Sequence, residues 1–502
     1  MLSNLISVLQ VLSPGLAGVM AGGVVGLVCY ACRPGMITVL AGSGGVLGYL
    51  LLAATIRMLD ANGMQALSAG LLNTCLTLLI VLTAVTLIIV SRHQLSVTPV
   101  RSNAGHKPLS NCESRPLSDP ASGSLVSYRF SVIFLTLLLA ALVGQNLYQA
   151  IASPVSSWDA LGLWTFWADR FADFHTTDEG AGGMTRTDYA SFPFEHPRHP
   201  LTLVHLAAFS GYALQGIETI RGWLAPWSFV WLCAAAVVCG FVREVSGNWL
   251  LAILATYGFC ALPLLENHAI LVGYADPWIA AVITMMTAVA ALGLCSNSWP
   301  LTLAAILFAV IPVALKNTGI LYVAALVVPL LTVLVMNRWP KTLAILVAVS
   351  CLIAYWKFSL GFDVTFLGSR FAVVWGEPND IVFGGYKMAF VPFPVGQILF
   401  NDLWAFLVNQ SFALVALVGL LTAVLAFDQI STLPPDASQA LKYLVLVTLM
   451  LLLIFLLPQV VTQYAERFAV PQSDLGNSRF LLGIGPVVLL TTAFWNGGSF
   501  VK

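Results

Sequence analysis

The chain has 502 residues, of which 59% are hydrophobic and only 9% are charged, and its formal net charge is zero. With a mean hydropathy of +0.90, this composition excludes a soluble globular protein. The absence of a basic excess argues against nucleic acid as a partner. The N-terminal sequence lacks the basic start and the small-residue cleavage site of a signal peptide, so we expect it to lie in the membrane.

Many uninterrupted apolar segments approach the roughly 20 residues that a membrane-spanning helix needs. Backbone groups in lipid must be satisfied within the segment, so helices are the expected spanning element, and alternating barrel strands do not fit. The sequence therefore predicts an all-α polytopic membrane protein with about 11–13 transmembrane helices. The clearest segments are residues 36–56, 67–90, 130–152, 277–294, 343–356, 403–427 and 480–495.

Charge asymmetry predicts the orientation of these helices. Residues 92–128 are basic and rich in Ser, Pro, Asn and Gly, so we expect a flexible loop on the cytoplasmic side. Residues 1–91 form three helices before this loop, and residues 129–502 form the module after it. The next polar break, residues 153–215, then lies outside, which in a bacterium is the periplasm. We therefore expect a protein of the bacterial inner membrane.

The apolar segment 201–215 does not fit as a simple span. If it crossed, the later basic turn with Arg338 and Lys341 would lie outside, against the positive-inside rule. We therefore expect an interfacial or re-entrant helix at the outer surface. Its His205 and the nearby Glu218 suit an interface better than hydrocarbon.

A polar island, residues 153–200, holds seven of the 22 acidic residues in the chain. Asp159 follows Trp158 just beyond a predicted span, and a carboxylate beside an interfacial aromatic belt would give the same pattern. Residues 195–200 combine a carboxylate, two imidazoles and a guanidinium, for which a rigid polar loop fixed by two prolines is the alternative. These side chains belong to Glu195, His196, Arg198 and His199.

Charged residues recur at the predicted outer ends of later helices. Asp276 starts a span in G-Y-A-D-P-W, where a carboxylate is also an ordinary helix cap. Lys316, in A-L-K-N-T-G, and Arg479, in N-S-R-F-L-L-G, are cations that snorkelling from helix ends would also explain. The same alternative applies to Lys357, Arg370 and Lys387.

Taken together, these residues suit a site that deprotonates a hydroxyl group and holds a phosphate. Arginine and lysine bind phosphate oxygens through charge-assisted hydrogen bonds, and a carboxylate can act as a general base. Carboxylates and neutral histidines also accept a divalent cation, for which Asp159, Asp276 and His196 are the candidates. No common nucleotide-binding or hydrolase motif occurs in a fitting context.

The ordered motifs W-D-A, H-P-R-H-P-L, G-Y-A-D, K-N-T-G and R-F-L-L resemble those of the integral-membrane GT-C glycosyltransferases. The resemblance is closest to the bacterial dolichyl-phosphate-mannose-mannosyltransferase-like group, and it covers residues 130–500. It implies a helical fold with a large, catalytic first outer loop that carries juxtamembrane helices. It also implies transfer of a sugar, with inversion, from a polyprenyl-phosphate carrier to an acceptor outside the cytoplasmic membrane.

The resemblance also implies roles for the matching residues. Asp159 corresponds to the first-loop aspartate, and Glu195 or His196 to the second catalytic or metal-binding position of that loop. The other correspondences are Asp276 to the aspartate before the following span, Lys316 to the K-N-x-G lysine, and Arg479 to the arginine before the last span.

Two departures from the family pattern, Arg198 and Thr318 in place of acidic residues, leave the sugar, the acceptor and the metal open. We expect Asp159, Glu195 and Asp276 to be catalytic. The expected partners are a polyprenyl-phosphate-sugar donor, a glycan or lipid acceptor and membrane lipids. The residues expected to bind the substrate phosphate are Lys316, Arg479, Arg198, His196 and His199.

Two other functions share this outward-facing pattern. An O-antigen ligase or polymerase also acts on polyprenyl-linked sugars outside the membrane. A transporter or flippase of lipid-linked or anionic solutes would need ionisable residues deep in its spans and broken helices in two repeated halves. The predicted spans are nearly free of charge and show no repeat, which favours an enzyme.

Overall fold

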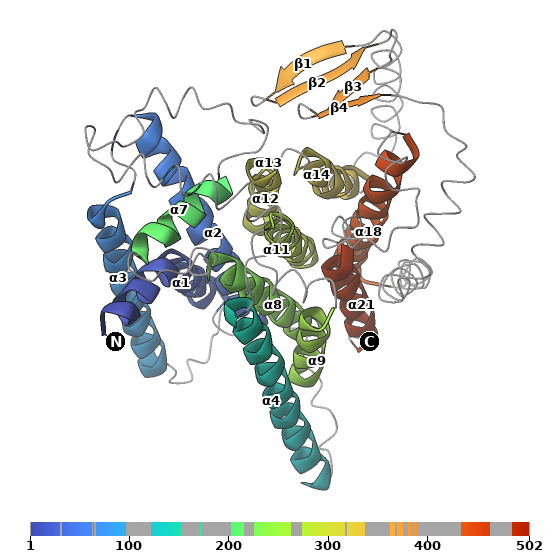
Figure 1. Cartoon of the computed structure of the whole chain (residues 1–502). Coiled ribbons are helices and arrows are strands. Elements are labelled where there is room, and N and C mark those ends of the chain that lie inside the picture. Colours follow the sequence, from blue (N-terminus) through green and yellow to red (C-terminus); the bar gives the residue numbers. More distant parts are fainter. Residues whose placement is uncertain are drawn as a thin grey trace. The chain divides into compact units, whose positions relative to one another are not determined.

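Figure 1 shows the chain as a computed structural model. The chain divides into two compact units. Unit 1 comprises Met1–Phe192, Thr202–Ala281 and Ala493–Lys502, and unit 2 comprises Pro193–Leu201 and Val282–Thr492. The structure describes residues 2–30, 33–62, 64, 67–96, 122–152, 168, 171, 202–214, 225–262, 274–316, 319–336, 362–366, 369–374, 380–383, 386–389, 433–461 and 484–500.

In this part of the chain, seven helices are long and apolar enough to cross a membrane, which confirms a multi-pass helical membrane protein. They are α1 (Leu2–Tyr30), α2 (Pro34–Ala61), α3 (Ala69–Ser96), α4 (Ser122–Ala152), α8 (Ala225–Ser246), α11 (Asp276–Cys295) and α18 (Pro435–Val461). Shorter apolar helices are α9 (Trp249–Cys260), α12 (Trp299–Phe308), α13 (Ile311–Leu315), α14 (Gly319–Met336) and α21 (Ile484–Phe500).

The boundaries differ from the sequence-based ones at the basic loop. Helix α3 continues to Ser96 and α4 begins at Ser122, so both helices extend into residues 92–128. The predicted segments 343–356 and 403–427 lie outside the described residues. The predicted division at residue 129 does not coincide with the two units, because α1, α2 and α8 pack together in unit 1.

Glycines bring α1, α2 and α8 into close contact. A Cβ atom at Gly18 of α1 would collide with the backbone carbonyl of Gly44 in α2. On another face of α2, a Cβ atom at Gly240 of α8 would lie 2.6 Å from the carbonyl oxygen of Gly35. Helices in lipid gain little from the hydrophobic effect, so small residues that permit close packing drive their association. Tyr49 of α2 adds a buried hydrogen bond, since its hydroxyl donates to the Val11 carbonyl at 3.1 Å.

Helix α7 (Thr202–Ala213) corresponds to the segment that we expected not to cross the membrane. Its 12 residues span about 18 Å at 1.5 Å per residue, which is too short for a hydrocarbon core of about 30 Å. Nearly all of its residues are buried, and it contacts α1, α2 and α8. It therefore packs as a short internal helix of unit 1. We had expected an interfacial or re-entrant helix, and the burial of α7 differs from a helix exposed along the membrane–water interface.

Contacts at helix ends are consistent with this arrangement. The hydroxyl of Tyr128, in the first turns of α4, donates to Asn248 Oδ1 in the turn after α8, at 3.2 Å. The start of α4 and the end of α8 therefore lie at the same end of unit 1. This contact fits helices α4 and α8 that run in opposite directions.

Unit 2 contains most of α11, the helices α12, α13, α14 and α18, and the first part of α21. Gly293 of α11 allows close approach of α12, since a Cβ atom there would lie 2.9 Å from the backbone nitrogen of Thr302. Helix α12 ends at Phe308 and α13 starts at Ile311; Pro312 explains the break, because it lacks an N–H group and its ring clashes with the carbonyl of residue 308. Helix α14 packs against α18, and the Thr448 and Thr491 hydroxyls, 3.5 Å apart, join α18 to α21.

A small β-sheet corrects the all-α expectation. Strands β1 (Phe362–Phe366), β2 (Ser369–Val374), β3 (Asp380–Phe383) and β4 (Tyr386–Ala389) pair antiparallel in that order. The sequence F-D-V-T-F alternates apolar and polar residues with the period of a strand. Arg370 and Lys387, expected at helix ends, instead lie in β2 and β4; Lys357 lies outside the described residues. The described part of the chain is thus helical with a four-stranded sheet.

Candidate functional site

The structure describes two of the residues predicted for the site, Asp276 and Lys316. Asp276 belongs to unit 1 and Lys316 to unit 2. Asp276 and Lys316 are the charged residues that are buried in the described part of the chain, with 3% of Asp276 and 9% of Lys316 exposed. The side chain of Glu244 is also largely buried, and its carboxylate is ion-paired with Arg33. The remaining predictions, Asp159, Glu195, His196, Arg198, His199 and Arg479, lie outside the described residues.

Asp276 is the first residue of α11. The Ile279 N–H donates to the Ala275 carbonyl at 3.1 Å, which is the first hydrogen bond of the helix. Pro277 fits this position because a helix accepts proline in its first turn. The partial positive charge of a helix N-terminus stabilises a carboxylate at this position. Burial of a charged carboxylate is nevertheless costly, and buried ionisable groups in membrane proteins are typically functional.

Aromatic rings fix the backbone around Asp276. Trp278, two residues further along α11, packs edge-to-face against Trp227 of α8, with ring centroids 5.6 Å apart. It makes a second edge-to-face contact with Tyr49 of α2, at 6.1 Å. The Trp227 indole N–H donates to the Tyr274 carbonyl at 2.7 Å and thereby joins the start of α8 to the segment that precedes Asp276.

These contacts place Asp276 at one end of unit 1. Trp227 lies in the first turn of α8, and Glu244 lies in its last turn, where it bonds to the start of α2. The 17 intervening steps correspond to about 26 Å along the helix axis, close to the thickness of the hydrocarbon core. Asp276 and the Arg33–Glu244 ion pair therefore lie at opposite ends of the spanning helices.

Lys316 lies in a tight turn between α13 and α14. Its backbone N–H donates to the Pro312 carbonyl at 3.1 Å, and its own carbonyl accepts from Gly319 N–H at 2.7 Å. A Cβ atom at Gly319 would collide with the Pro312 carbonyl, which explains the glycine of the K-N-T-G motif. The ammonium group follows the C-terminus of α13, and a helix C-terminus stabilises a cation.

Part of the acidic island packs against α7. Ala168 and Phe171 are buried and helical, and the Phe171 ring lies 4.9 Å from the ring of His205 in α7. His205 is 1% exposed, so it does not lie at an open interface as we expected from the sequence. These two residues of the polar island thus belong to unit 1, while the rest of residues 153–200 lies outside the described part of the chain.

Among the described residues, no three His, Cys, Asp or Glu side chains gather as a metal site. Of the three metal candidates, Asp276 alone is described, while Asp159 and His196 lie outside those residues.

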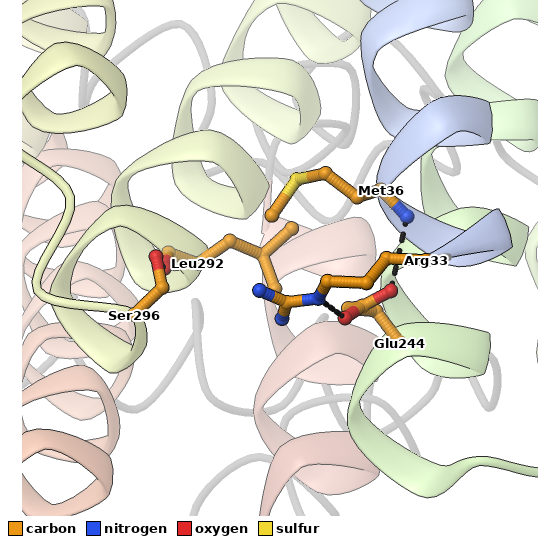
Figure 2. Close-up of polar contacts among 5 residues, drawn as sticks. All are labelled: Arg33, Met36, Glu244, Leu292 and Ser296. Atoms are coloured by element: carbon orange, nitrogen blue, oxygen red, sulfur yellow. Dashed lines mark hydrogen bonds and ion pairs between the residues drawn. The ribbon is translucent and has the colours of Figure 1, made fainter. Parts of the chain in front are cut away.

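Sequence reasoning missed a group of polar contacts at the other end of unit 1. Glu244 accepts from Arg33 Nε at 2.5 Å and from the backbone N–H of Met36 at 3.1 Å (Figure 2). The guanidinium carbon of Arg243 lies 5.1 Å from the centroid of the Trp249 ring. The partners of the ion pair are 211 residues apart, so no local pattern could have linked them.

Comparison with known proteins found no matching family model, curated protein or solved structure.

Proposed function

We propose that this protein is a glycosyltransferase that moves a sugar from a polyprenyl-phosphate-linked donor to an acceptor at the outer face of the membrane. The observation that carries the proposal is the burial of Asp276 and Lys316, each at the end of an apolar helix. Both positions belong to the motifs that resemble the GT-C enzymes. Burial supports a functional role, since it raises the energetic cost of keeping a charge at each position.

In the proposed mechanism, the acceptor hydroxyl attacks the anomeric carbon and the polyprenyl phosphate leaves. Asp159 takes the hydroxyl proton as general base, and Asp276 orients the acceptor or, if a divalent cation binds, would be one of the residues that hold it. Lys316 and Arg479 stabilise the negative charge that develops on the leaving phosphate. The loop residues that complete the site are Glu195, His196, Arg198 and His199.

The position of the buried charges favours an enzyme over a transporter. A transporter would be expected to carry ionisable residues near the middle of its spans. Asp276 and Lys316 lie at helix ends, as a reaction at the membrane surface requires. The proposed location is the bacterial inner membrane, with the site facing the periplasm.

The first test compares cells with and without this protein by mass spectrometry of surface glycans and lipid-linked intermediates. A transferase predicts loss of one sugar from the product and accumulation of its polyprenyl-phosphate donor. Loss of a whole polysaccharide chain would instead indicate a ligase or polymerase. An unchanged donor pool and glycan profile would refute the proposal.

A matched pair of variants tests Asp276 itself. Asp276→Asn should lower transfer by about a hundredfold, the loss expected when a substrate is no longer held in its reactive orientation. Asp436→Asn is the control, because Asp436 is also an acidic first-turn residue of a spanning helix but is only partly buried. Equal effects of the two substitutions on transfer and stability would reduce Asp276 to an ordinary helix cap.

A further inference from the structure

Four helix ends meet at the end of unit 1 opposite Asp276. They are the starts of α2, α4 and α9 and the end of α8. We call their side chains Arg33, Tyr128, Arg243, Glu244 and Trp249 the polar junction. Asn248 connects two of the ends, because its Oδ1 accepts from Tyr128 at 3.2 Å and from the Leu250 N–H at 2.8 Å.

The carboxylate of Glu244 is already committed within the polar junction. One oxygen accepts from Arg33 Nε, and the other accepts from the Met36 N–H, one of the donors that a helix leaves unpaired in its first turn (Figure 2). Only 9% of the Glu244 side chain is exposed. Glu244 therefore neutralises Arg33 and caps α2.

Arg243 has donors that the described residues do not satisfy. Its guanidinium lies over the Trp249 ring, but its Nε and Nη1 atoms are buried and form no hydrogen bond to the described part of the chain. A buried donor without an acceptor is unfavourable, and a guanidinium presents its donors in a fork that matches an anionic oxygen pair. Cation–π stacking alone leaves these N–H groups unused.

The polar junction has a positive excess. It holds two guanidinium groups and one carboxylate, and the N-terminus of α2 adds partial positive charge. Tyr128 and Trp249 border it, each 37% exposed, and aromatic residues of this kind are enriched where membrane helices meet the headgroup region. The donors of Arg243 thus lie among helix ends that two half-exposed aromatic residues border.

We propose that the polar junction binds a phosphate group, to which Arg243 donates through its guanidinium fork. The group belongs either to a membrane lipid headgroup or to free inorganic phosphate. This site does not depend on the proposed transferase function, since Asp276 and the polar junction lie at opposite ends of α8.

Native mass spectrometry of the full chain in detergent tests the site with three probes: phosphatidylglycerol, phosphatidylcholine and inorganic phosphate. We expect Arg243→Met to weaken binding about tenfold or more, as loss of charge-assisted hydrogen bonds predicts. Arg57→Met is the matched control, because Arg57 is an exposed arginine near the opposite end of α2. It should bind as wild type does.

The probes and variants separate the possible outcomes. Retention of either lipid but not of inorganic phosphate assigns a headgroup, and retention of inorganic phosphate alone assigns a soluble anion. Arg243→Lys keeps a cation over Trp249 but lacks the fork, so it should recover only part of the binding. Wild-type binding by Arg243→Met or Arg243→Lys, or an equal loss in Arg57→Met, would overturn the proposal.

Discussion

Replacement of Gly240 by alanine tests the glycine packing of unit 1. The new Cβ atom would lie 2.6 Å from the Gly35 carbonyl oxygen and 2.7 Å from the Val39 nitrogen. Both are backbone atoms, so α2 and α8 must move apart, and overpacking of this kind costs about 1–3 kcal/mol. Alanine also gains about 1 kcal/mol over glycine within a helix. The net change is therefore about 0–2 kcal/mol of destabilisation.

Gly144→Ala in α4 is the matched control. No atom lies within 4 Å of a Cβ built at Gly144, so the substitution retains the helix gain without a clash. It should stabilise the protein by about 0.5–1 kcal/mol. Thermal unfolding of both variants in the same detergent measures the difference, for which the clash predicts about 1–3 kcal/mol. Equal stabilisation by the two substitutions would refute the contact between α2 and α8.

Two further predictions concern the start of α8 and the orientation of the chain. Trp227→Phe removes the hydrogen bond to the Tyr274 carbonyl and should destabilise the protein by about 1 kcal/mol more than Trp231→Phe. Trp231 is the control because its buried indole N–H forms no hydrogen bond with the described residues. The unfolding midpoints of the two variants measure the difference. In a background without accessible cysteines, Ser122→Cys should react with a membrane-impermeant thiol reagent from the cytoplasmic side and Gly182→Cys from the outside, and labelling of Ser122→Cys from outside would contradict the predicted topology.

The spanning helices were predictable because the membrane sets their length. Residues 36–56 and 277–294 fall within α2 and α11, whose observed ends lie only a few residues beyond the predicted ones. Apolar length is a local property, and any helix that crosses lipid must have it. Helix ends were less predictable, since α3 and α4 continue past the apolar segment into polar sequence.

The β-sheet and the polar junction were not predicted, for different reasons. The strands are four to six residues long. An alternation of apolar and polar residues over so few positions is a weak predictor of a strand, especially between long apolar segments. The Arg33–Glu244 pair depends on the packing of α2 against α8, which depends in turn on glycines such as Gly35 and Gly240. Sequence spacing indicates that small residues are present, but it does not say which helix they face.

The candidate site shows the same limit. The sequence indicated that Asp276 and Lys316 occur at helix ends, but helix capping and snorkelling explained the pattern equally well. Burial is the property that distinguishes these residues, since a snorkelling lysine extends its charge into water. Near Asp276, the Trp227, Trp278 and Tyr49 rings join residues far apart in the sequence, and such tertiary packing cannot be inferred from a local motif.

These features assign different roles to the two ends of unit 1. In lipid, close glycine contacts and a few polar bonds must hold α1, α2 and α8 together, because apolar burial contributes little there. That rigid packing keeps Asp276 buried at one end while Glu244 caps α2 at the other. A substitution at Gly240 should therefore lower stability without altering the proposed transfer by the folded protein, whereas one at Asp276 should lower the proposed transfer while the helices stay packed. Measurement of transfer and unfolding on the same variants would separate the packing of unit 1 from its proposed catalytic role.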